Sequence, residues 1–157
     1  MAEYNVFVSH SMRPEDLAII YEAARDAAIR GITCYVAERD VQLGKSLPAK
    51  IENAIRTCDC FVVFLTHGGA SSAYVNQEIG LARGCGKLRI QVVEKGVQVK
   101  GFDIDKEYIT LDRWNPAAAI SQLNEYLLRK KAEKEAQQTA GLFLVAALAL
   151  LAIFRGK

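Results

Sequence analysis

Short apolar runs alternate with segments of helical spacing along most of the chain. Runs rich in β-branched and aromatic residues predict five strands, at residues 4–9, 32–36, 60–66, 88–93 and 108–111. The run 60–66 is apolar on both faces, which indicates a central strand covered on both sides, whereas the last run is short and is expected at a sheet edge. Apolar positions three or four residues apart predict helices at 15–30, 48–56, 72–83 and 116–135.

This alternation predicts an α/β fold with a parallel sheet and helices on both faces. Five strands with short connections favour the flavodoxin-like order 2-1-3-4-5, in which a binding crevice opens above the carboxyl ends of strands 1 and 3. We therefore expect Ser9, His10 and Ser11 to line the crevice together with the loop 66–72. Glu78 lies in the helix that follows this loop, off its predicted apolar stripe, and is the candidate carboxylate.

Composition narrows the class of protein. The 157 residues are 51% hydrophobic and 24% charged, which suits one packed domain, and a net charge of +2 does not indicate a nucleic-acid partner. The N-terminal residues lack the basic and apolar regions of a signal peptide. Four cysteines and two histidines form no metal-ligand spacing, so we expect free thiols, no metal site and a cytoplasmic setting.

Three segments carry a resemblance to a known family. Val6-Phe-Val-Ser-His-Ser11 is similar to the first conserved box of bacterial TIR (Toll/interleukin-1 receptor) domains, and Glu38-Arg-Asp-Val-Gln-Leu-Gly44 is similar to their BB loop. Ser72-Ala-Tyr-Val-Asn-Gln-Glu78 resembles the Ser-x-Trp-x-x-x-Glu pattern that ends in the catalytic glutamate of NAD-consuming members. Tyr74 stands where many relatives carry tryptophan, and Leu43 replaces a proline that often precedes the BB-loop glycine.

The resemblance covers residues 4–130 and implies an NAD+ nucleosidase or cyclase of a prokaryotic defence or signalling system, active as an assembly. NAD+ would be the substrate, with no cofactor or metal, and Glu78 would stabilise the charge that builds on the ribose. The implied substrate-binding residues are Ser9, His10, Ser11, Arg39, Lys45, Ser72 and Tyr74. Of these, Tyr74 would stack on the nicotinamide, and Arg39 and Lys45 would meet the pyrophosphate or a neighbouring subunit.

Simpler interpretations remain open for the same residues. Glu78 is also compatible with a solvated helix position, Tyr74 with core packing, His10 with a structural hydrogen bond, and Arg39 and Lys45 with solvated loop charges. A non-catalytic TIR adaptor that acts through TIR–TIR contacts is the alternative function. A third interpretation is an N-glycosidic enzyme that acts on another nucleotide.

After the domain at 1–130, the chain no longer alternates between predicted strands and helices. A charged linker or helix extension at 131–139 leads to a hydrophobic tail helix at 140–157, whose residues 140–154 carry no charge. At about 1.5 Å per residue this apolar segment spans about 23 Å, somewhat less than a hydrocarbon core of about 30 Å. Because the tail is apolar all round and the sheet is complete without it, we favour a membrane anchor over an assembly helix buried between subunits. The cations Arg129, Lys130, Lys131 and Lys134 would keep the domain cytoplasmic.

Overall fold

The computed structural model describes residues 3–37, 48–68, 70, 72–99 and 108–155. Five strands form one parallel sheet in the order β2-β1-β3-β4-β5, which confirms the expected order and fold class. The strands are β1 (Asn5–Ser9), β2 (Thr33–Val36), β3 (Cys60–Leu65), β4 (Leu88–Glu94) and β5 (Ile109–Leu111). The helices are α1 (Pro14–Ile29), α2 (Ala49–Thr57), α3 (Ala73–Gly84) and α4 (Ala117–Arg155).

Helices cover both faces of the sheet, so the core has two halves. Successive side chains of a strand point to opposite faces. Val6 and Val8 of β1 therefore pack in the half that contains α1 and the first part of α4, while Phe7 packs in the half that contains α2 and α3. All six residues of β3 are buried, as expected for the central strand.

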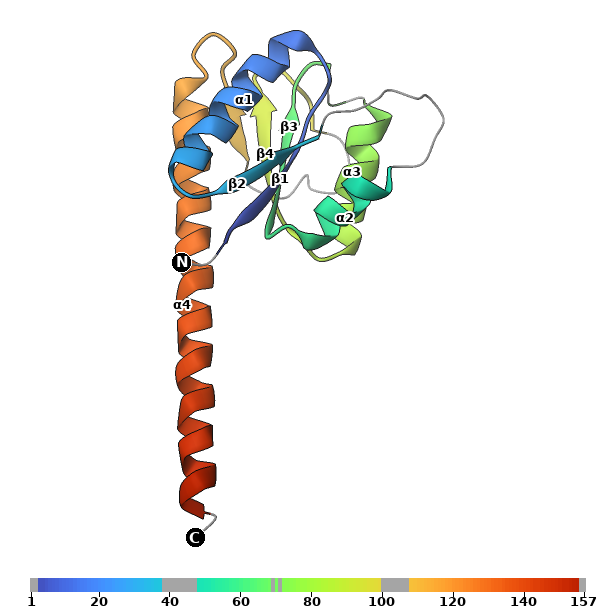
Figure 1. The fold of residues 1–157 in the computed structure, drawn as a ribbon. Coiled ribbons are helices and arrows are strands. Elements are labelled where there is room, and N and C mark those ends of the chain that lie inside the picture. Colours follow the sequence, from blue (N-terminus) through green and yellow to red (C-terminus); the bar gives the residue numbers. More distant parts are fainter. Residues whose placement is uncertain (1–2, 38–47, 69, 71, 100–107, 156–157) are drawn as a thin grey trace.

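All the strands point the same way and define two edges that recur below. We call the edge where the strands end the carboxyl edge, and the opposite edge, where they begin, the amino edge. In Figure 1 the β4 arrow points to the carboxyl edge, and α4 begins near that edge, passes the amino edge and runs on beyond the domain. The edge strand β5 pairs only with the last three residues of β4 among the described residues.

Helix α3 brings the candidate carboxylate to the sheet. The side chain of Ser72 accepts a hydrogen bond from the backbone N–H of Val75, so Ser72 caps the helix as expected. The buried residues of α3 are Val75, Glu78 and Ala82, which recur at helical spacing on one side. The prediction that Glu78 lies off the apolar stripe is therefore wrong, because α3 buries this residue fully, while Ile79 is only half-buried against the same core.

Helix α4 is one continuous helix of 39 residues. Ala119, Ile120, Leu123 and Leu127 are buried against the domain. The charged stretch and the apolar tail continue the same helix, and the tail residues with a described burial are exposed. By length and composition, the part of α4 from Ala117–Ile153 contains a window able to cross a membrane, and none of that window is buried.

Candidate active site at the carboxyl edge

Ser9 and Glu78 meet where β1 ends. Ser9 is the last residue of β1 and, like Phe7 two residues before it, faces the α2 and α3 side of the sheet. Its hydroxyl donates a hydrogen bond to Oε2 of Glu78, 69 residues further along the chain. Both residues are fully buried, with 0% of their surface exposed. Glu78 is therefore not a solvated helix residue, and the structure brings together two of the residues selected from the sequence.

His10 and Ser11 follow Ser9 and are also buried. Nδ1 of His10 lies 2.5 Å from the carbonyl oxygen of Ser11. The Ser11 hydroxyl donates to Oδ2 of Asp16 at 2.5 Å, so its described contact is with α1 rather than with Glu78. Two serines that the sequence assigned to one crevice thus bind two different carboxylates.

The other selected residues divide into those at the start of α3 and those outside the described residues. Ser72 is half-buried and its hydroxyl caps α3. Tyr74 is half-buried in the first turn of the same helix, one turn before Glu78. Arg39 and Lys45, with the whole BB-loop segment at 38–44, lie outside the described residues.

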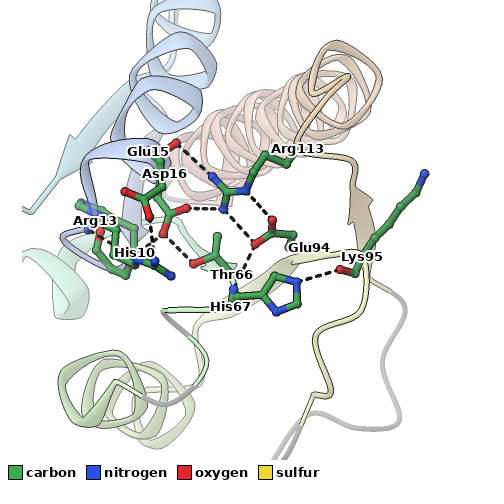
Figure 2. A network of polar contacts seen from close by, with 10 residues as sticks. His10, Arg13, Glu15, Asp16, Thr66, His67, Glu94, Lys95 and Arg113 are labelled. Atoms are coloured by element: carbon green, nitrogen blue, oxygen red, sulfur yellow. Dashed lines mark hydrogen bonds and ion pairs between the residues drawn. The ribbon is translucent and has the colours of Figure 1, made fainter.

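A second polar cluster, with no member among the residues selected from the sequence, occupies the α1 side of the same edge (Figure 2). We call Asp16, Glu94 and Arg113 the ion-pair cluster. The Arg113 guanidinium donates to Oδ1 of Asp16 at 2.6 Å and to the two Glu94 oxygens at 2.5 and 2.9 Å. Thr66 adds a hydrogen bond to Asp16 at 2.7 Å, and the backbone N–H of His67 adds one to Glu94 at 3.1 Å. The last residue of β4 and the segments that follow β3 and β5 are thereby tied to the first turn of α1.

The guanidinium keeps both carboxyl groups of the cluster ionised. Burial raises the pKa of Asp16, but hydrogen bonds from Ser11, Arg113 and Thr66 outweigh it and hold that pKa below its usual value. The hydrogen bond from Arg113 outweighs burial at Glu94 and lowers its pKa as well. The same two carboxylates, Glu94 first, raise the pKa of Arg113. A guanidinium that donates to two carboxylates forms a strong, charge-assisted contact.

No local pattern in the sequence indicates this cluster. Asp16 has the ordinary position of an acidic residue in the first turn of a helix, where the helix dipole favours it. Arg113 lies 97 residues away, just after the edge strand. A cavity of about 540 Å³, lined in part by Glu94, Arg113 and the exposed Trp114, opens beside the cluster.

The four cysteines carry free thiols, as expected. Burial raises the pKa of Cys34 to about 11 and that of Cys60 to about 12. Thiols with such pKa values remain protonated at neutral pH, so these two behave as small hydrophobic side chains rather than as nucleophiles.

Comparison with known proteins gives one family and a set of related folds. The family model described as TIR domain matches residues 6–124. No curated protein sequence matches the chain. Among solved structures, the TIR domain of the Toll-related receptor TRR-2 from Hydra magnipapillata has a TM-score of 0.61 and 17% identity, covering 79% of this chain and 98% of that chain.

Two further structures share the fold. The CMP N-glycosidase BcmB of Clostridium botulinum has a TM-score of 0.56 and 19% identity, covering 78% of this chain and 98% of that chain. A prokaryotic SEFIR domain has a TM-score of 0.56 and 14% identity, covering 80% and 92%. At these identities the likeness concerns the fold.

Proposed function

The chain belongs to the TIR domain family, and from that premise we propose that it cleaves the bond between nicotinamide and ribose in NAD+. The observation that carries the proposal is a glutamate, Glu78, buried at the carboxyl edge of the sheet and held there by the Ser9 hydroxyl. A buried carboxylate is costly and rarely retained without a partner or a task. The crevice position where the strand order reverses is where folds of this type bind nucleotides.

The chemistry requires one carboxylate. As the bond from ribose C1′ to the nicotinamide nitrogen breaks, the bonding electrons go to the pyridinium ring, which leaves as neutral nicotinamide and needs no general acid. Positive charge then builds on the ribose ring, and a nearby carboxylate lowers the energy of this oxocarbenium-like state. Water adds to C1′ and loses a proton, so NAD+ and water give ADP-ribose, nicotinamide and one proton.

Other residues would support this step in different ways. Ser9 fixes the orientation of Glu78 through its hydrogen bond. Tyr74, one turn before Glu78 on α3, would offer an aromatic surface to the nicotinamide. Arg39 and Lys45 would bind the pyrophosphate or close the site of a neighbouring subunit, in an assembly formed through TIR–TIR contacts.

The test follows nicotinamide release by purified full-length protein in detergent and in membranes. We expect wild type to convert NAD+ and Glu78→Ala to be inactive, whereas Glu22→Ala, at an exposed position on α1, retains activity. CMP belongs in the substrate panel, because a protein of similar fold is a CMP N-glycosidase. Turnover of CMP but not NAD+ would redirect the proposal to another nucleotide. A flat time course for assembled wild type with every nucleotide, equal to that of Glu78→Ala, would favour an adaptor.

We also propose that the end of α4 anchors the domain to a membrane from the cytoplasmic side. Residues 136–154 carry no charge, and as a helix they are about 28 Å long, close to the thickness of a hydrocarbon core. The large apolar side chains Leu142, Phe143 and Ile153 are 65–74% exposed, which is unfavourable in water. An assembly helix buried between subunits is the competing interpretation, and extraction with alkaline carbonate separates the two. An anchored protein stays in the membrane pellet.

A further inference from the structure

Three contacts fix α4 to the amino edge as it leaves the domain. Nζ of Lys134 lies 2.8 Å from Oδ1 of Asp59 and donates to the carbonyl oxygen of Glu3 at 2.7 Å. Nζ of Lys131 donates to the carbonyl oxygen of Gly31 at 3.0 Å. These contacts join the helix to three separate segments of the amino edge, so the direction of the tail relative to the sheet is set by the fold.

No spacer separates the domain from the apolar part of α4. The uncharged stretch begins at residue 136, two residues after Lys134, and the helix continues without a break. Figure 1 shows α4 running past the amino edge and onward, away from the end of the sheet that carries Ser9 and Glu78. A membrane that receives the tail would therefore meet the amino edge of the domain first.

The amino edge also exposes apolar side chains around α4. Ile29, at the end of α1, is 79% exposed, and Leu88, at the start of β4, is 37% exposed. Tyr108, which precedes β5 and lies beside the middle of β4, is 51% exposed. Leu88 and Tyr108 line one cavity with Arg129 of α4. Ile29 lies at the other side, where Lys131 contacts the Arg30 and Gly31 carbonyls. Scattered apolar residues are ordinary on a surface, but these three lie on either side of α4 in the part of the domain from which the tail leaves.

Cations accompany these apolar residues. Arg30 and Arg129 are exposed, and residues 129–135 hold four cations and two acids. Apolar and aromatic side chains mixed with Arg and Lys are typical of surfaces that lie in the headgroup region of a bilayer.

We infer that the amino edge, defined by Ile29, Arg30, Leu88, Tyr108 and Arg129, is a second membrane-contacting surface that lies against anionic lipid headgroups. The inference rests on the proposed insertion of the tail and adds an orientation to it. The domain stands on the bilayer by this edge, and the carboxyl edge, which carries Glu78, faces the cytoplasm. Cation attraction to anionic lipid and burial of the three apolar side chains would both favour this docked state.

The single tryptophan offers a test, because Trp114 lies after β5 on the carboxyl side and is 93% exposed. The full chain is reconstituted in vesicles of phosphatidylcholine and phosphatidylglycerol that carry a headgroup quencher of tryptophan fluorescence. In wild type, quenching of Trp114 fluorescence measures how close the carboxyl edge comes to the headgroups. In the background of Trp114→Phe, the substitutions Ile29→Trp and Tyr108→Trp report on the amino edge, and Phe143→Trp reports on the tail, with an acyl-chain quencher.

Each outcome bears on a different proposal. We expect strong quenching at positions 29, 108 and 143, and weak quenching at 114. Quenching at 143 together with weak, equal quenching at 29, 108 and 114 would overturn the inference while leaving the anchor intact. Absence of quenching at 143 would overturn the anchor and the inference with it.

The choice of anionic headgroups has its own test. Arg30→Gln and Arg129→Gln, each combined with Trp114→Phe and Tyr108→Trp, should lower the equilibrium constant for docking about fivefold per cation removed. Arg13→Gln, an exposed arginine at the carboxyl edge, is the matched control and should have no effect. If quenching at position 108 is the same in all three variants as in the parent reporter protein, the surface does not recognise anionic lipid. Unchanged quenching in vesicles without phosphatidylglycerol would lead to the same conclusion.

Discussion

Two buried carboxylate sites share the carboxyl edge of the sheet, one on each face. On the α3 side, the hydroxyl of Ser9 donates to Glu78. On the α1 side, the guanidinium of Arg113 binds both Asp16 and Glu94. The two sites differ in how their described contacts connect the chain: the Ser9 hydroxyl joins β1 to α3, whereas the Arg113 guanidinium joins the segment after β5 to both β4 and α1.

The comparison separates position from role. All three carboxylates lie where a parallel sheet binds its ligands, so their position alone does not mark a catalytic group. A carboxylate held by a guanidinium is committed to that ion pair, which joins segments distant in the sequence. We therefore assign stability to the ion-pair cluster, while the assignment of chemistry to Glu78 belongs to the proposed function, and the predictions below test that division.

The largest expected effect is on turnover. Glu78→Gln keeps the size of the side chain but removes the negative charge, and should lower NAD+ cleavage on the order of 10²–10³-fold, as loss of a transition-state contact does. The urea midpoint in mild detergent should not fall, because a neutral amide is less costly to bury than a carboxylate. If Glu78→Gln is clearly less stable than wild type but cleaves NAD+ at the same rate per folded molecule, Glu78 has a structural role and not a catalytic one.

Loss of the guanidinium should act on stability instead. Arg113→Met leaves Asp16 and Glu94 buried without their cation, and should lower the free energy of unfolding by about 3 kcal/mol. We take the low end of the range for such pairs because Arg113 is itself 23% exposed. Urea unfolding of the full chain in detergent measures the change. A loss of less than about 1 kcal/mol, as for a surface pair, would contradict a structural role.

The difference in unfolding free energy between wild type and Arg113→Met should also depend on pH. Because the pKa values of Asp16 and Glu94 are lowered by folding, their contribution is present above their unfolded values of 3.8 and 4.5 and is lost as the pH falls through the lower folded values. Loss of the guanidinium raises both pKa values in the folded variant, so the stability gap between wild type and Arg113→Met should be largest at neutral pH. It should shrink as the pH falls through the variant's higher pKa values towards the lowered values of wild type. A gap that stays constant down to pH 2.5 would show that charge is not its cause.

The smallest effect concerns Ser72, which the resemblance assigned to substrate binding. Its hydroxyl accepts a long hydrogen bond, 3.5 Å, from the Val75 N–H. Ser72→Ala should cost about 0.5 kcal/mol of stability through loss of this cap. If capping is its whole role, KM for NAD+ is unchanged. A clear rise in KM at unchanged stability would place Ser72 with Glu78 in the substrate site.

Local patterns predicted the elements of the fold, and they failed where side chains from distant segments meet. The run 60–66 was apolar on both faces and became the fully buried β3, and Ser72 capped α3 as expected. Helical spacing favoured Ile79 over Glu78 as a core residue because a glutamate in an apolar stripe is unfavourable alone. The burial of Glu78 involves Ser9, which is 69 residues away and invisible to a pattern within one helix.

The ion-pair cluster was missed for the same reason. Asp16 and Arg113 are each ordinary within their own segments, and 97 residues separate them. Sheet order brings the carboxyl ends of β3, β4 and β5 beside the start of α1, so such a pair can be recognised only after the topology is known. The resemblance located Glu78 because it compares spacing with known members rather than with an ideal helix.

The unbroken course of α4 limits how two copies could meet. A domain on a straight helix without a hinge, once inserted, would diffuse laterally in an upright posture and could rotate about the membrane normal but not tumble. In Figure 1 β4 runs roughly along α4, whereas β1 and β2 cross it obliquely, and β2 and β5 lie at opposite flanks of the sheet. Encounters between neighbours would then be side by side, with every carboxyl edge at the same height above the lipid.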